Sequence, residues 1–114
     1  MGTKQVYLES RVLSKRYCHP YEREIKLGDI IEFIRVDADF DVAIVNHDNF
    51  LQKEDGSAEL AIINVRFDEN LTSKKWKVNS SATAPTREYS VNEISSKFYA
   101  DSPGSSPPKI IIIE

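Results

Sequence analysis

Short runs in which apolar and polar residues alternate, separated by turn residues, are the main pattern of this chain. The alternation is clearest at 5–10 and 75–78, and further short runs that predict strands lie at 22–27, 30–36, 60–67, 88–91, 97–99 and 110–113. Alternate side chains of a strand point to opposite faces of a sheet, so the pattern predicts strands with one buried face. Val42–Val45 is a continuous apolar run, which predicts a strand covered on both faces. The 46–52 segment fits either a loop or one helical turn.

Turn residues separate the predicted strands. Gly28-Asp29 and Asp55-Gly56 are turn signals, because glycine adopts positive φ and aspartate accepts a local backbone N–H. His19-Pro20 predicts a bend, since proline disfavours helix at the residue before it. Residues 79–86 are dense in Ser, Thr, Ala and Pro and are predicted as a surface loop.

Many short strands and no segment of helical length predict an all-β fold, either a sandwich or a barrel. The sequence has 114 residues, and 40% of them are hydrophobic. This is enough for a single domain over residues 1–114 with its own core. Four isoleucines at 110–113 would pair with other chains if their strand edges were free. We therefore expect that strand to lie inside a sheet.

Composition narrows the classes of partner. The net charge of −3 and the pI of about 5.4 give little electrostatic drive for binding nucleic acid, so proteins, sugars or small solutes are favoured. No run approaches the ~18 apolar residues of a transmembrane helix. The segment after Met1 lacks the apolar core of a signal peptide. Because a leader can be removed from a mature protein, this observation does not decide the compartment. The single cysteine excludes an internal disulfide.

Three carboxylates form the strongest candidate for cation binding. Asp37, Asp39 and Asp41 alternate, so in an extended chain they share one face about 7 Å apart. Carboxylates converging in this way suit a hard cation such as calcium. However, Val42 and Asp48 stand where an EF-hand loop needs glycine and glutamate. A solvated acidic loop is therefore the favoured interpretation.

Cysteine and histidine are too few for a zinc centre. Zinc needs three or four protein ligands, and the neighbours Cys18 and His19 point to opposite sides of an extended chain. His47 is the only other histidine. Nothing marks Cys18 as an activated thiolate, so a partly buried free cysteine is expected.

Aromatic and basic residues are interleaved around Tyr17, Tyr21 and Trp76. Such surfaces stack bases or sugars. Alternation favours the opposite arrangement, in which the rings pack inward and the cations are solvated.

Two segments together resemble the cupredoxin family of blue-copper β-sandwiches. Gly28-Asp29-Ile30-Ile31-Glu32-Phe33 is similar to the G-D, V/I-x-F element that precedes the first ligand strand in that family. Tyr99-Ala100-Asp101-Ser102-Pro103-Gly104, followed by Lys109-Ile110-Ile111-Ile112, is similar to its Y-x-C-x-P-H-x-x-M loop and K-I-x-V strand. The resemblance covers 22–46 and 87–114.

The copper ligands of that pattern are missing. Asp101 stands in place of the thiolate and Gly104 in place of the second imidazole, and the first imidazole falls near Phe40 or Asp41. A blue-copper centre needs two imidazoles and a cysteine. The resemblance therefore implies a Greek-key sandwich without copper or another cofactor, whose last strand is interior and pairs with 97–99.

The resulting hypothesis is a non-catalytic binding or interaction module for a protein or carbohydrate partner. Its contact surface would be the loops 37–41, 79–86 and 100–108, including Asp101, Ser102 and Pro103. The resemblance implies an extracytoplasmic setting. The alternative is an SH3-like or OB-type barrel that binds peptide or single-stranded nucleic acid through Tyr17, Tyr21 and Trp76. An enzyme with paired carboxylates has no supporting spacing.

Overall fold

A computed structural model describes residues 2–10, 17–80, 86–94, 98–99 and 107–113. The described residues form short strands and no helix that could cross a membrane. The strands are β1 Thr3–Leu8, β2 Cys18–His19, β3 Glu22–Lys26, β4 Ile30–Arg35, β5 Phe40–Val45, β6 Leu51–Gln52, β7 Ile62–Phe67, β8 Ser73–Val78, β9 Thr86–Glu93, β10 Phe98–Tyr99 and β11 Lys109–Ile113.

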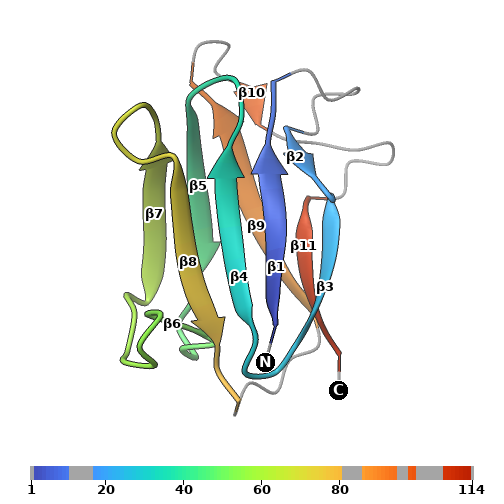
Figure 1. Cartoon of the computed structure of the whole chain (residues 1–114), viewed down its shortest axis with the longest axis vertical. Coiled ribbons are helices and arrows are strands. Elements are labelled where there is room, and N and C mark those ends of the chain that lie inside the picture. The colour runs from blue at the N-terminus through green and yellow to red at the C-terminus, as the bar shows by residue number, and fades with distance from the viewer. Residues whose placement is uncertain (1, 11–16, 81–85, 95–97, 100–106, 114) are drawn as a thin grey trace.

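Two sheets pack face to face as a sandwich (Figure 1). The first sheet has the order β2-β1-β4-β8-β6, and the second has the order β3-β11-β9-β5-β7, with β10 added to β9. The pairs β1–β4 and β11–β3 are parallel and the others are antiparallel. The predicted all-β sandwich is confirmed, and the barrel alternative is wrong.

Phe33 lies at the centre of the core and joins the two sheets. Its ring is 5.6 Å from that of Trp76 in the first sheet. Across the sandwich it is 6.4 Å from Phe67 and 5.4 Å from Tyr89, measured between ring centroids. Alternate residues along the central parts of the longer strands face this core, as the alternation predicts, whereas Lys4 in β1 and Lys74 in β8 are exposed.

The turn at Gly28-Asp29 forms as predicted, but it connects strands of different sheets. Gly28 has φ +83°, which glycine adopts without strain. β3 lies in the second sheet and β4 in the first, so the turn passes from one layer to the other. The Asp29 carboxylate accepts a hydrogen bond from the backbone N–H of Gly2 (3.0 Å). The predicted local acceptor role is therefore wrong.

β5 is covered on one face only. It lies between β9 and β7, and its alternate residues Val42 and Ile44 are buried. Val45 points to the outer face and is 60% exposed. The prediction of a strand covered on both faces is wrong, because the second sheet has nothing packed on its outer side among the described residues. The 46–52 segment is a turn that leads into β6 and not a helical turn.

The isoleucine strand β11 lies inside the second sheet, as predicted, between β3 and β9. The predicted pairing with 97–99 is wrong, because β10 pairs with β9 instead. β9 is long enough for both neighbours: β11 pairs with its start at Thr86–Glu88, and β10 pairs with its end at Asn92 and Glu93.

Candidate functional site

The position of the first expected copper ligand is filled by an aromatic core residue. Phe40 begins β5 and is fully buried, with its ring centroid 5.9 Å from that of Tyr17. Asp41 points to the other face, where it accepts a hydrogen bond from the Arg66 guanidinium (3.1 Å). Asp101 and Gly104 lie outside the described residues.

The thiol and the two imidazoles of the chain are kept apart. Cys18 is a buried free cysteine, as predicted, and the Tyr89 hydroxyl donates to its sulfur at 3.9 Å. His19 lies beside the end of β1, whereas His47 follows β5 at the opposite end of the sandwich (Figure 1). Because a blue-copper centre needs these three groups together, the residues of this chain do not fit one.

The three predicted cation ligands are each bound to a different group. Asp37 accepts hydrogen bonds from the backbone N–H and hydroxyl of Ser10 (2.8 and 2.9 Å), and Asp39 forms an ion pair with Arg35. Asp41 is paired with Arg66. Across the described part of the chain, no three His, Cys, Asp or Glu side chains group to hold a metal ion. This geometry gives the cation hypothesis no support.

The rings of the candidate aromatic surface are packed inward, the arrangement that alternation favoured. Trp76 is fully buried and donates its indole N–H to Glu59 (3.0 Å). Tyr17 is buried and Tyr21 is packed against the core.

The turn at 37–39 and the described start of the 79–86 loop, which were predicted to contribute to one contact surface, lie at opposite ends of the sandwich. The turn between β4 and β5, which contains residues 37–39, is at one end of the sandwich. β8 ends and β9 begins at the opposite end, so Asn79 and Ser80, at the start of 79–86, are remote from it (Figure 1). The predicted contact residues Asp101, Ser102 and Pro103 lie outside the described residues.

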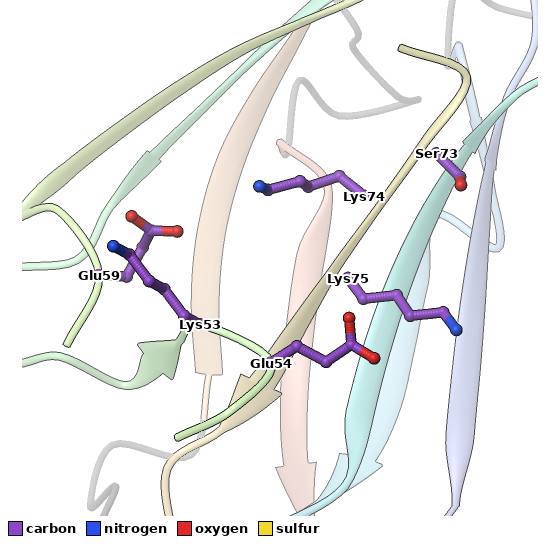
Figure 2. A pocket seen from close by; sticks show the side chains of 6 residues that line it. All are labelled: Lys53, Glu54, Glu59, Ser73, Lys74 and Lys75. Carbon is purple, nitrogen blue, oxygen red and sulfur yellow. The ribbon is translucent and has the colours of Figure 1, made fainter. Parts of the chain in front are cut away.

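A surface pocket of about 480 Å³ lies beside β8. Figure 2 shows that Lys74 and Lys75, consecutive in this strand, extend to opposite sides, Lys74 toward the segment that carries Glu59. The Glu59 carboxylate is held by Trp76 and by the Leu60 N–H (2.9 Å). Its role is therefore structural, and the pocket is a solvated mixture of charges. It is lined by Lys53, Glu54, Glu59, Ser73, Lys74 and Lys75.

Two large aliphatic side chains are exposed side by side on the outer face of the second sheet, and a third is exposed in the segment that leads into β7. Val45 and Ile62 are direct cross-strand neighbours in β5 and β7, with exposed fractions of 60% and 53%. Leu60 is 68% exposed, and its carbonyl accepts a hydrogen bond from the buried Asn46 amide (3.1 Å). We call these three residues the apolar patch. A shallow hollow of about 250 Å³ adjoins it over Ala43 and Ser90.

The same face becomes polar toward the other end of β5. Asp41 and Arg66 are cross-strand neighbours there, and their ion pair raises the pKa of the Arg66 guanidinium. A second hollow of about 400 Å³, which Asn64 and Asn92 also line, shares Ala43 and Ser90 with the apolar one. The outer face therefore has an apolar end and a charged end joined by small residues.

The sequence analysis missed the apolar patch because it assigned the Val42–Val45 run entirely to the core. The available signal was alternation within that run: if Val42 and Ile44 face inward, Ala43 and Val45 must face outward. A run of four apolar residues in a sheet with one open face therefore marks an exposed site.

No protein-family model matches the chain, and no curated protein matches it. Solved structures of amicyanin variants do. The Cu(I) form of a methionine-to-alanine variant has a TM-score of 0.57 and 15% identity, and the match covers 99% of this chain and 84% of that one. The Cu(I) form of a methionine-to-glutamine variant has a TM-score of 0.56 and 15% identity, over 98% of this chain and 83% of that one. This chain thus has a cupredoxin-like fold.

Proposed function

We propose that this chain is a non-catalytic protein-interaction module on a cupredoxin-like sandwich without copper, and that it binds its partner through the apolar patch. The observation that supports this most is the exposure of the cross-strand neighbours Val45 and Ile62, with Leu60 also exposed in the segment that leads into β7. Single exposed aliphatic residues are ordinary, but adjacent ones form a surface whose removal from water is favourable.

The surroundings of the apolar patch have the arrangement expected of a protein interface. Interfaces commonly have an apolar centre and a polar rim. Here Glu88 and Ser90 line the adjoining hollow, and the Asp41–Arg66 pair lies farther along the same face. The rim offers both signs of charge, so it suits a polar protein surface more than a polyanion.

A protein partner is favoured over a carbohydrate. Sugar rings are commonly bound by stacking on exposed aromatic side chains. The apolar patch is aliphatic, and Tyr89, which lines the adjoining hollow, is buried with its ring against Phe33 in the core. Aliphatic side chains on a broad sheet face instead match the apolar side chains of another protein.

Three titratable groups among the described residues have shifted pKa values, and their separate positions support a non-catalytic role. Enzymes usually place such groups together in a cleft. Here a hydrogen bond from Ser57 lowers the pKa of Asp55, which lies in an exposed turn. Burial raises the pKa of Tyr89 in the core, and the pKa of Arg66 is raised by its ion pair. These three groups lie at separate places and have structural partners.

A photoreactive benzoylphenylalanine at Val45 is expected to crosslink to a different polypeptide in cells that make this chain. The matched control carries the same residue at Glu24, which is exposed on β3 of the same sheet and lies outside the apolar patch. Adding Leu60→Lys to the Val45 variant should reduce the adduct about tenfold, a typical effect at an interface anchor. Gel mobility and mass spectrometry measure the adduct.

Equal adducts from both positions, or no adduct from Val45, would contradict the proposal. So would an adduct composed only of two copies of this chain. A circular dichroism melt of each variant checks that the lysine and the photoreactive residue leave the fold unchanged.

A further inference from the structure

Most free strand edges of this sandwich carry features that hinder pairing with another chain. An unpaired edge presents backbone N–H and C=O groups that another strand can bind, and proteins counter this with short strands, lysines and inward-pointing charges. The edge strands β2 and β6 of the first sheet are only two residues long. β1 continues beyond β2 and carries the exposed Lys4 there.

β3, one edge of the second sheet, is protected by charge. Four of its five residues are charged, and Arg23 alternates with the exposed Glu22 and Glu24, so it lies on the inner face with Ile25. In the first sheet, β6 pairs with β8 only at Val78 and Lys77. The remaining free edge of β8 carries Lys74 and Lys75, and lysines on an edge hinder its pairing with another strand.

β7, the other edge of the second sheet, lacks these features. It has six residues, with neither proline nor lysine. Its inward positions Ile63, Val65 and Phe67 are all apolar, and Val65 is only partly buried. Its one charged residue, Arg66, points outward and is paired with Asp41 within the sheet. Within the described residues, β7 is therefore the long edge that is open to strand addition.

The geometry points to a second copy of this chain as the occupant: we infer that two molecules pair antiparallel, β7 to β7, so that their second sheets form one continuous sheet. Antiparallel pairing of identical strands satisfies a two-fold axis, so one sequence has to complement only itself. This inference concerns the edge of the sheet and does not depend on the proposed function.

The sequence of β7 complements itself in one register. If Asn64 lies on the two-fold axis, it faces Asn64 of the second copy. An amide side chain both donates and accepts hydrogen bonds, so the two asparagines can hydrogen-bond to each other. Ile63 then faces Val65 of the second copy on the inner side, which extends both cores across the junction. On the outer side Ile62 faces Arg66 of the second copy, whose aliphatic stem can cover it. Val45 lies one strand away from the junction.

The inference is tested by sedimentation velocity of the full chain from about 1 µM to about 1 mM, the range of weak to moderate homodimers. We expect a species of twice the 13.0 kDa mass to grow with concentration. Asn64→Lys places two like charges face to face and should weaken the dimer at least about tenfold. Asn70→Lys, an exposed change in the turn after β7, is the matched control and should leave it unchanged.

Charge complementation makes the test specific to the two-fold axis. Asn64→Lys and Asn64→Asp should each dimerise at least about tenfold more weakly than the unsubstituted chain, and an equal mixture of the two should recover the dimer. A chain that is monomeric at every concentration would overturn the inference, as would a dimer that Asn64→Lys weakens no more than Asn70→Lys does. Neither result would affect crosslinking of a different protein at Val45, so this inference and the proposed function fail separately.

Discussion

Replacing Phe33 with alanine is expected to lower the free energy of unfolding by about 3–5 kcal/mol, the range for a buried phenylalanine that leaves a cavity. Phe33 is fully buried and packs against rings from both sheets, Trp76 on its own side and Phe67 and Tyr89 across the core. The cavity would lie where the two layers join. Since a domain of this size is stable by about 5–15 kcal/mol, much of its stability would be lost.

The measurement is urea unfolding followed by tryptophan fluorescence, which reports directly on the environment of Trp76. Leu60→Ala is the control, because Leu60 is exposed and its loss should change stability by less than about 0.5 kcal/mol. Similar effects of the two substitutions would show that Phe33 does not hold the sheets together.

Asn46→Ala is expected to lower the free energy of unfolding by about 2–3 kcal/mol, although Asn46 is a polar residue in a loop. Its buried side chain accepts a hydrogen bond from the Leu51 N–H (2.9 Å) and donates to the carbonyls of Leu51 (2.9 Å) and Leu60 (3.1 Å). Each buried group left without a partner costs about 1–3 kcal/mol. The substitution should also release Leu60 and so weaken crosslinking at the apolar patch.

Asn70→Ala is the matched control for Asn46→Ala. Its side chain is exposed, and the hydrogen bond of this residue to Asp68 uses the backbone N–H, which alanine keeps. Urea unfolding should find its stability within about 0.5 kcal/mol of the unsubstituted chain. A small effect at Asn46 would mean that water replaces its three hydrogen bonds.

Most of the longer strands could be predicted from sequence because they depend on side-chain patterns within six or so residues, whereas the two-residue strands β2, where a bend was predicted, and β6 were missed. Lys75–Val78 illustrates this: the pattern placed Trp76 inward, and Trp76 is fully buried. Gly56 illustrates the same point for turns, with φ +89° at a predicted turn. The interior position of β11 also followed from a local property, the apolar character of four isoleucines that need paired edges.

The pairing partners could not be predicted in the same way, because they depend on residues far apart in sequence. The local sequence at Gly28-Asp29 is compatible both with a turn between neighbouring strands and with a turn that crosses from one sheet to the other. β11 pairs in parallel with β3, some ninety positions earlier in the sequence, and the short β10 pairs elsewhere on β9. Local patterns carry no information on such choices.

The candidate interaction surface was missed for a related reason. Whether an outward-facing valine is exposed depends on whether another layer covers the sheet, and Val45 does not reveal this by itself. The inward packing of Tyr17 and Trp76, which alternation favoured over an exposed aromatic surface, is confirmed. Tyr17 and Trp76 lie among basic residues in sequence, but their rings are buried in the core, Trp76 from β8 and Tyr17 from the residue before β2.

Copper titration of the full chain is the most direct test of the central claim, that a cupredoxin-like sandwich here serves binding and not electron transfer. With one equivalent of Cu(II), we expect neither the intense visible absorption of a copper–thiolate bond nor a rise in the unfolding midpoint, because Cys18 is buried and His19 and His47 lie at opposite ends. An intense visible band that appears with a raised midpoint, and that Cys18→Ser abolishes, would contradict the account.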